Sequence, residues 1–442
     1  MRRPTPRART RLNSRSARSE ESAEQVGNVR IDAIAAGGDG VGRLSGLACF
    51  VPRTAPGDVA QVAYVPHARY ARGRVLQLLE SSSLRVEPAC RHYVADKCGG
   101  CQLQHLTANA QRDARRHIVR DALQRVGHRD VALPELVSGA EWGYRERLTL
   151  ALRSRGAGWI GGLHAFDDAG RVFVLEECPI AHPRLIECWL RVRHLLRGLP
   201  NLRPGTTLRV SLRLLGDPGD RVALVVLGGV AWSEAGAWAT AVRADVTPIA
   251  AVWWEPEGGA AVQLSGDPEP EVMAFAQVNP DVAHALREHV LASARGFAPS
   301  SVIDAYSGRG ELAEALARDG ARVTAIELDA VATARASSRL SAFPNARAIT
   351  ALVEDALDQA LPADLVVLNP PRRGVDIRVT ASLAEAATRG VRGILYVSCD
   401  PATLARDLSR LPRWRVASLQ CFDMFPQTAH VETVCVLIPE DS

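Results

Sequence analysis

The sequence predicts an α/β protein in which a doubly wound domain follows a small β-barrel and a mixed α+β region. From about residue 275, short apolar runs such as "SVIDAY" and "GILYVS" alternate with helical segments, which is the pattern of a mostly parallel sheet covered by helices. Residues 25–80 alternate apolar and polar side chains between glycine turns, which is typical of a small barrel. Residues 145–270 combine strand-like runs with one strong helical pattern, "PRLIECWLRVRHLLRGL".

Changes in composition divide the 442 residues into five segments. We expect an Arg-rich tail without fixed structure at 1–24, a β-barrel at 25–82, a cysteine cluster with a basic helix at 83–144, an α+β domain at 145–272 and the doubly wound domain at 273–442. Within the α+β segment, "HAFDDAGRVFVLEECPI" predicts a hairpin that turns at 168–170.

The positive charge of the chain lies in its first residues. Residues 1–24 hold seven Arg and three Glu, and the remainder carries 46 basic and 46 acidic side chains. A folded body without net charge must bind nucleic acid through a local patch. No run of about 18 apolar residues occurs, so we expect no membrane span.

The expected compartment is a reducing cytoplasm. The first residues lack the apolar stretch of a secretory signal, although their Arg and Ser content is shared by transit peptides. The nine cysteines are odd in number, which disfavours a disulfide framework.

Two basic stretches are candidates for RNA contact. Arg69, Tyr70, Arg72 and Arg74 interleave on the last barrel strand, which suits single-stranded nucleic acid as well as it suits an ordinary solvated edge. In the helix that follows the cysteine cluster, the arginines at 112, 116 and 120 share one face, and a solvated face is the favoured interpretation over an RNA-facing one.

The first strand of the doubly wound domain leads into a glycine turn, in "VIDAYSGRGELAEALA". Gly308 and Gly310 allow the backbone to approach a ligand at the start of a helix. Glu327 ends the next strand, where an acidic residue binds ribose hydroxyls. Asp355 is expected at the end of the third strand, where a group that binds adenine would lie. These features indicate an adenosine-bearing cofactor, either S-adenosylmethionine or NAD.

The fourth strand ends in "VVLNPPRRG", which is typical of methyltransferases that act on nucleobases and not of dehydrogenases. The double proline makes a rigid loop on which a flat base can stack, so S-adenosylmethionine is favoured over NAD. A plain turn at the end of a strand is the alternative.

Cys399 ends the fifth strand, directly before the helix-start signals Asp400 and Pro401. Because helix N-termini lower thiol pKa values, this position predicts a reactive thiolate. An unreactive buried cysteine is the alternative.

Taken together, "DAYSGRGE", "NPPRRG", "SCDPATLARDL" and "FPQTAHVETV" resemble the RNA uracil-5-methyltransferases. The stretch "GGDGVGR…FVPRTAPGD" resembles the OB-like TRAM domain of that family, and "FAQVN" at 275–279 resembles its segment before the Rossmann-like sheet. The resemblance implies methyl transfer from S-adenosylmethionine to C5 of a uridine flipped out of structured RNA. It implies that Cys399 adds to C6 and that Glu432 removes the C5 proton. It also implies cofactor contacts from Gln277, Tyr306, Glu311, Glu327 and Asn369.

The resemblance implies 23S ribosomal RNA as the first choice of substrate, tRNA as the second, and a monomeric enzyme. Asn369 replaces the Asp usual in the family, as in one 23S rRNA branch that lacks the barrel seen here, so the motifs point to different branches. Gln427 stands where His is common, and we expect this change to be tolerated.

Three cysteines are spaced C-x7-C-x2-C, at Cys90, Cys98 and Cys101, and Cys178 follows in "EECPI". Four such residues generally indicate zinc. The resemblance implies instead a 4Fe–4S cluster on these four thiolates, with a structural or RNA-docking role. Cys49, Cys188, Cys421 and Cys435 are expected in the cores.

Two other functions stay open at this point. Cytosine-5 methylation uses the same thiol addition, and the product nucleoside distinguishes it. An RNA-binding or assembly factor with a vestigial cofactor site is a second alternative, which the intact glycine turn, thiol and glutamate disfavour.

Overall fold

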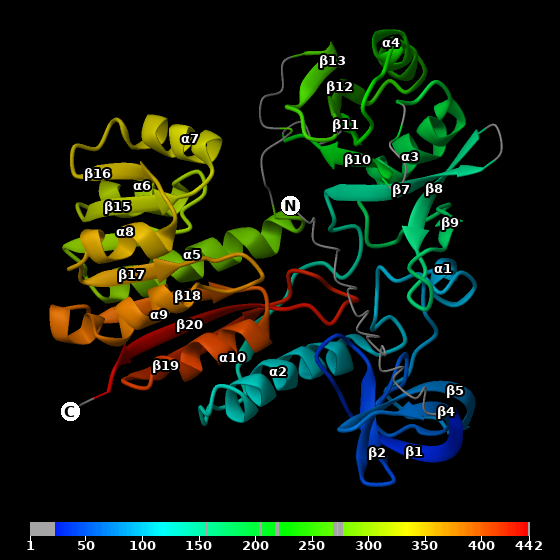
Figure 1. The fold of residues 1–442 in the computed structure, drawn as a ribbon, viewed down its shortest axis with the longest axis horizontal. Coiled ribbons are helices and arrows are strands. Elements are labelled where there is room, and N and C mark those ends of the chain that lie inside the picture. Colours follow the sequence, from blue (N-terminus) through cyan, green and yellow to red (C-terminus); the bar gives the residue numbers. More distant parts are fainter. Residues whose placement is uncertain are drawn as a thin grey trace, which may run out of the picture.

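A computed structural model describes residues 23–155, 158–200, 202, 206–216, 221–267, 272 and 277–440 (Figure 1). Nearly all of the expected Arg-rich tail lies outside these residues, and "FAQVN" is described only from Gln277 onward. Across the described ranges, no helix combines the length and the apolar character that a membrane crossing needs. The structure confirms the predicted fold class, with a barrel, a central sheet and a doubly wound sheet.

The amino-terminal strands close into a barrel in the order β1-β2-β3-β5-β4. Alternate residues point inward, so that Val29, Ile31, Val51 and Val62 form its core. The strands are β1 (Gln25–Ile34), β2 (Gly40–Leu44), β3 (Leu47–Val51), β4 (Val59–Pro66) and β5 (Tyr70–Glu80).

The central region is a seven-stranded sheet in the order β13-β12-β11-β10-β7-β8-β9. Helix α3 (Pro183–Val192) packs on it because Leu185, Cys188, Trp189 and Val192 recur on one face. The predicted hairpin is confirmed, since β8 pairs antiparallel with β9. The elements are β7 (Arg147–Arg155), β8 (Gly158–His164), β9 (Val172–Val174), the 3-10 helix η1 (Arg193–Leu195), β10 (Leu208–Leu214), β11 (Val222–Leu227), α4 (Ala235–Asp245), β12 (Ile249–Glu255) and β13 (Val262–Gly266).

The carboxyl-terminal sheet has eight strands in the order β16-β15-β14-β17-β18-β20-β19-β6. The first five are parallel, and β20 is antiparallel to both of its neighbours. The strands are β14 (Ser301–Ala305), β15 (Arg322–Glu327), β16 (Ala346–Thr350), β17 (Leu365–Leu368), β18 (Gly393–Ser398), β19 (Trp414–Phe422), β20 (Glu432–Pro439) and the short β6 (Glu135–Val137).

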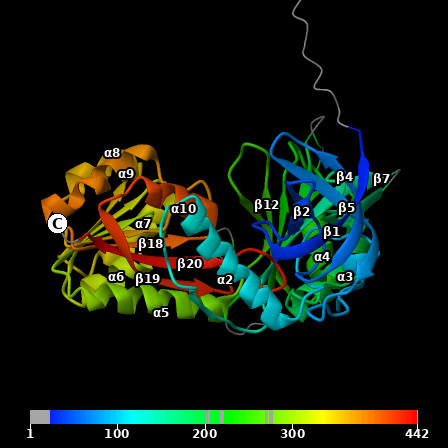
Figure 2. The ribbon, with the colours of Figure 1, turned by 90° about the horizontal axis from the view of Figure 1, so that it is seen from below.

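Helices cover both faces of this sheet (Figure 2). Consecutive strand residues alternate between two cores; for example, Ile394 and Tyr396 pack toward one layer and Leu395 and Val397 toward the other. One layer contains α2 (Ala108–Arg125), α8 (Val353–Ala360), α9 (Ile377–Ala384), η3 (Ala386–Arg389) and α10 (Pro401–Ser409); the other contains α5 (Pro280–Gly296), α6 (Glu311–Arg318) and α7 (Ala330–Leu340).

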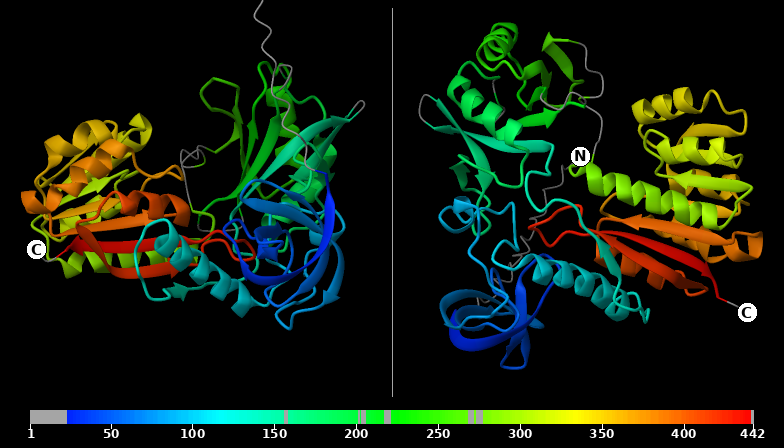
Figure 3. Two further views of the ribbon diagram at one scale, coloured as in Figure 1. Left: turned by 60° about the horizontal axis from the view of Figure 1, so that its bottom comes forward. Right: turned by 180° about the vertical axis from the view of Figure 1, so that it is seen from behind.

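The segment around the cysteines connects the barrel to the carboxyl-terminal sheet (Figure 3). It begins with the short α1 (Arg91–Val94), and α2 then packs on α10 while β6 adds a strand beside β19. The arginines at 112, 116 and 120 on α2 form ion pairs with carboxylates at 141, 113 and 121, and their side chains are only partly exposed. The loop between β19 and β20 reaches this segment, where Gln102 N–H and Leu103 N–H donate to the Gln427 carbonyl.

Candidate active site

Cys399 and Glu432 lie at the same edge of the carboxyl-terminal sheet. The antiparallel register pairs Ser398 of β18 with Thr433 of β20. Cys399 directly follows Ser398 and Glu432 directly precedes Thr433, so the two residues lie beside this pair, and the charge of Glu432 acts on the Cys399 thiol. Cys399 is half-buried and Glu432 is 5% exposed. The register therefore brings together the two residues to which the sequence analysis gave the catalytic roles.

The expected low thiol pKa of Cys399 is wrong for this structure. Burial raises the pKa of the Cys399 thiol, and the nearby Glu432 carboxylate raises it further. The charge of Arg372 and a backbone N–H act in the opposite direction but are outweighed. A helix N-terminus lowers a thiol pKa only where desolvation and neighbouring anions do not exceed its effect.

Glu432 has an electrostatic environment that suits proton transfer. Burial raises the pKa of its carboxyl to about 7, against the lowering influence of Arg372. A carboxyl with a pKa close to neutrality is matched to the task of a general base. Arg372 is therefore a residue of this site that the sequence analysis missed, and its only signal was its place directly after the double proline.

A compact turn holds Cys399 between strand and helix. Asp400 caps α10 as predicted, because its Oδ1 accepts a hydrogen bond from Thr403 N–H at 2.9 Å. The Ser398 hydroxyl oxygen accepts from Asp400 N–H at 3.2 Å, and Pro401 opens the helix.

The glycine turn after β14 lies against Glu327. Gly308 and Gly310 adopt the left-handed region, with φ of 54° and 75°, and Tyr306 also has a positive φ of 60°. Glu327 Oε2 accepts from Gly308 N–H at 2.9 Å, so the carboxylate at the end of β15 is fixed beside the turn. No atom lies within 4 Å of a Cβ built on Gly308, which leaves open space in front of this backbone.

The other cofactor candidates lie around the same strand ends. Glu311 opens α6 and pairs with Arg309, Gln277 is half-buried shortly before α5, and Asn369 directly follows β17 with an exposed side chain. Asn369 N–H donates to the Ala305 carbonyl of β14 at 3.2 Å. The sequence analysis missed Asp304, whose buried Oδ2 lacks a hydrogen-bond partner and whose pKa burial raises to about 7.

The expectation for Asp355 is wrong in its placement. Strand β16 ends at Thr350, and Asp355 lies in the first turn of α8, where it forms an exposed ion pair with Arg378 at 2.7 Å. The adjacent Glu354 is the better-placed acid, since its side chain is 9% exposed and its charge acts on Tyr306. The helix begins earlier than the apolar pattern indicated, and this shift moves the two acids onto different faces.

The four candidate metal-binding cysteines line one cavity of about 100 Å³. The Cys98 sulfur accepts a hydrogen bond from Gly100 N–H at 3.4 Å, and Tyr93 N–H and Ala181 N–H donate to the backbone carbonyls of Cys90 and Cys178. Burial raises all four thiol pKa values. The cavity is lined by Cys90, Cys98, Cys101 and Cys178, together with aromatic, aliphatic and polar neighbours.

Among the residues that the structure describes, no three Cys, His, Asp or Glu side chains are close enough to hold one metal ion. The remaining cysteines are core residues as expected, with Cys49 in the barrel, Cys188 under the central sheet, and Cys421 and Cys435 in the carboxyl-terminal sheet.

Comparison with known proteins adds to this geometry. Residues 270–440 match the family model described as tRNA (Uracil-5-)-methyltransferase. An uncharacterized RNA methyltransferase of Thermosynechococcus vestitus is 33% identical over 92% of this chain and 97% of its own. The 23S rRNA (uracil(1939)-C(5))-methyltransferase RlmD of Thiobacillus denitrificans is 31% identical over 90% of this chain and 96% of its own.

One solved structure shares the architecture over nearly the whole chain. It is the Pyrococcus abyssi tRNA (uracil-54, C5)-methyltransferase in complex with S-adenosyl-L-homocysteine, with a TM-score of 0.63 and 23% identity. The match covers 94% of this chain and 100% of that chain, and it shows that the fold is shared.

Proposed function

Because the chain belongs to the RNA uracil-5-methyltransferase family and is an S-adenosylmethionine-dependent enzyme of that class, we propose that it methylates C5 of a uridine in 23S ribosomal RNA. The observation that carries the proposed chemistry is the position of Cys399 and Glu432 on either side of the Ser398–Thr433 pair, where the charge of Glu432 acts on the thiol. The 31% identity to an RlmD over nearly the full length of both chains supports 23S RNA as the target, with tRNA as the second candidate.

The residues around β14 fit the cofactor. The open space in front of Gly308 allows a ligand to approach the backbone, and the unpartnered Oδ2 of Asp304 offers a buried acceptor beneath the same turn. The acidic pair Asp304 and Glu327 suits ammonium and hydroxyl donors. Bound S-adenosylmethionine would supply an electrophilic methyl group at this edge of the sheet.

In the proposed mechanism, Cys399 acts first. Its thiolate forms a bond to C6 of the uracil, and the electron pair of the C5–C6 double bond makes C5 nucleophilic enough to be methylated. Glu432 then accepts the C5 proton. The electron pair left at C5 restores the double bond and expels the Cys399 thiolate, so the residue returns to its starting state.

The thiol must be ionised against a raised pKa, and Arg372 is the cation that favours this ionisation. The negative charge of the Glu432 carboxylate raises the pKa of the Cys399 thiol. The free enzyme therefore disfavours the state in which both groups are ionised at once. Once Cys399 is bonded to C6 it carries no charge, so the Glu432 carboxylate can then accept the C5 proton.

We further propose that Cys90, Cys98, Cys101 and Cys178 hold a 4Fe–4S cluster. The four cysteines line one cavity, and a 4Fe–4S cluster needs four such thiolate ligands. The hydrogen bond from Gly100 N–H to the Cys98 sulfur stabilises a thiolate ligand. The role of the cluster would be structural, because the same segment contacts the loop that leads to Glu432.

Trapping the covalent adduct tests the mechanism. Glu432→Gln should accumulate an RNA adduct on Cys399 with 23S RNA fragments, because the C5 proton is no longer removed. Cys399→Ala should give neither adduct nor product, whereas the matched control Cys435→Ala, a core cysteine of the same sheet, should keep both. Methylation that survives in Cys399→Ala would refute the mechanism.

Product analysis tests the substrate. We expect 5-methyluridine in 23S RNA fragments and not in tRNA transcripts. Methylation of tRNA alone would show that tRNA is the substrate, and 5-methylcytidine would show that the methylated base is cytosine. Failure to bind S-adenosylmethionine by calorimetry would favour the assembly factor.

A further inference from the structure

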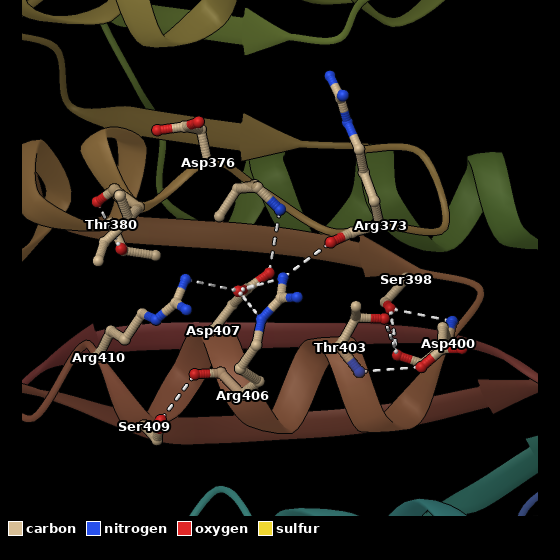
Figure 4. Close-up of polar contacts among 12 residues, drawn as sticks. Arg373, Asp376, Thr380, Ser398, Asp400, Thr403, Arg406, Asp407, Ser409 and Arg410 are labelled. Carbon is tan, nitrogen blue, oxygen red and sulfur yellow. Dashed lines mark hydrogen bonds and ion pairs between the residues drawn. The ribbon is translucent and has the colours of Figure 1, made fainter. Parts of the chain in front are cut away.

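The loop that carries the double proline is bonded to α10 at residues 372, 373 and 375; Figure 4 shows the contact between Arg406 and Arg373. The Thr403 hydroxyl donates to the Arg372 carbonyl at 3.2 Å, and Arg406 Nη2 donates to the Arg373 carbonyl at 2.8 Å. Asp407 Oδ2 accepts from Val375 N–H at 3.0 Å. One face of a single helix therefore fixes the backbone of residues 372–375.

Asp407 is the centre of this attachment. Its side chain is fully buried, and Oδ2 also accepts from the Tyr396 hydroxyl of β18 at 2.7 Å. Oδ1 accepts from Arg406 Nε at 2.9 Å and from Nη2 at 2.8 Å. A buried carboxylate is stable only when charged and neutral donors surround it, and here both oxygens are occupied.

The backbone of the loop is in close contact with the side chains of Arg406 and Asp407. Gly374 has a φ of 75°, and a Cβ added there would collide with Asp407 Oδ2 and with Arg406 Nη2. The backbone of the loop can approach the carboxylate this closely only because position 374 is glycine.

The same helix also positions the nucleophile. Cys399 directly precedes the N-cap Asp400, so α10 carries the thiol at its start and the loop on its side. The loop in turn carries Arg372, the cation that acts on Cys399 and on Glu432. Helix α10 therefore positions both the Cys399 thiol and the loop that carries Arg372.

We propose that Asp407 is a positioning residue that, with Arg406, fixes the loop of residues 372–375 so that Arg372 stays beside Cys399 and Glu432. It acts through the loop and touches no reacting atom. This inference rests on the proposed function, because it assigns the positioned cation to the thiol that would attack the uracil.

The test measures the ionisation of Cys399 directly, without RNA. The rate at which iodoacetamide alkylates Cys399 is followed by mass spectrometry as a function of pH in the purified full chain. The charged groups that act on this thiol are Glu432 from β20, Arg372 from the loop and Asp400 from the start of α10. Glu432 and Asp400 are unchanged in all variants, so a difference in the profile reports the position or loss of the Arg372 charge.

Asp407→Asn replaces one acceptor oxygen by a donor amide, which cannot serve Arg406, Tyr396 and Val375 together. We expect the apparent pKa of Cys399 to rise by about half a unit, which lowers the alkylation rate at pH 8 about threefold. Arg372→Gln should give the same shift. The matched control is Ser409→Ala, which removes a hydroxyl bonded only to the Arg406 carbonyl within α10 and should leave the profile unchanged.

Gly374→Ala keeps the test falsifiable if Asp407→Asn does not fold, because it displaces the loop and leaves the Asp407 carboxylate in place. We expect the same shift, together with a kcat about tenfold lower on the RNA that the wild type methylates and an unchanged KM for S-adenosylmethionine. A profile equal to that of the wild type in Gly374→Ala and Asp407→Asn would overturn the inference. If the variants shift the alkylation profile as expected but the wild type forms no 5-methyluridine, the positioning of Arg372 stands and the proposed function is overturned.

Discussion

Cys399 and Glu432 flank the last pair of the antiparallel ladder between β18 and β20, because Cys399 directly follows Ser398 and Glu432 directly precedes its partner Thr433. Each is an acid whose pKa is raised, and the Glu432 carboxylate itself raises the pKa of the thiol. The ladder therefore places a nucleophile and a proton acceptor together at the cost of desolvating both. The effects of pH on stability and on activity follow from this relationship.

Glu432→Gln should stabilise the protein at high pH. Because burial raises the pKa of Glu432 from 4.5 to about 7, the contribution of its protonated form is fully present below pH 4.5 and is lost as the pH rises through 7. The wild type should therefore be less stable than the variant by up to about 3 kcal/mol at pH 8, and the two should coincide near pH 4.5. Urea unfolding at pH 4.5 and 8 measures the difference.

The control for this prediction is Glu385→Gln, an exposed carboxylate paired with Arg413. Its unfolding should show no comparable dependence on pH, since surface pairs contribute little. An equal loss of stability for Glu432→Gln at both pH values would contradict the prediction and would indicate a packing effect.

Methylation should increase with pH through neutrality. Both groups act in their basic forms, so kcat should rise as Glu432 loses its proton near pH 7 and should continue to rise above pH 8, where more of the Cys399 thiol ionises. Single-turnover rates between pH 5.5 and 9 measure this dependence. A rate that is already maximal below pH 6 would be inconsistent with the raised pKa of Glu432.

The fold could be predicted because its signals are local. The alternation of strands and helices after residue 275 places apolar residues on both faces of each strand, and such runs form parallel sheets covered by helices. The hairpin between β8 and β9 likewise follows from its turn residues. The strand β6 could not be predicted, because three residues pair with β19, almost 300 positions away in the sequence.

The site was predictable in its residue types but not in its energetics. Resemblance of motifs selected Cys399 and Glu432, but the thiol pKa depends on burial and on a partner from another strand, which the helix-start signal does not reveal. The predicted position of Asp355 was wrong because a shift of a few residues at a helix start changes which side chain faces the site. Arg372 and Asp407 acquire their roles only from contacts between separate elements.

Cys101→Ser should remove the proposed cluster while leaving cofactor binding intact. The wild-type protein should be brown, with about four iron atoms per chain, and the variant should lose both colour and iron. RNA methylation should fall sharply, because residues 102 and 103 donate to the Gln427 carbonyl in the loop before Glu432. S-adenosylmethionine affinity should be retained, since Gly308 and Glu327 lie on other elements.

The control for the cluster is Cys421→Ser, a buried cysteine of the carboxyl-terminal sheet that should keep its iron. Iron and zinc are measured together on anaerobically purified protein. A colourless wild type with stoichiometric zinc would contradict the proposed cluster.

The buried ion pair between Arg115 and Asp423 should stabilise the loop that leads to Glu432. Arg115 Nη2 lies 2.6 Å from Asp423 Oδ2, the two side chains are 1% and 4% exposed, and Arg115 Nη1 donates to the Thr428 carbonyl at 2.7 Å. Arg115→Met leaves the Asp423 carboxylate buried without its cation, which typically costs about 3–5 kcal/mol. Urea unfolding at pH 8 should show this loss.

The double variant Arg115→Met with Asp423→Leu distinguishes a lost pair from a packing defect. Replacing both charges by apolar groups removes the uncompensated carboxylate, so most of the lost stability should return. The methylation rate should be lower than that of the wild type in both the single and the double variant, because both lack the hydrogen bond from Arg115 to the Thr428 carbonyl. Arg125→Met, whose side chain is 80% exposed on the same helix, should change neither stability nor rate. A double variant as unstable as the single one would show that Arg115 acts through packing and not through its charge.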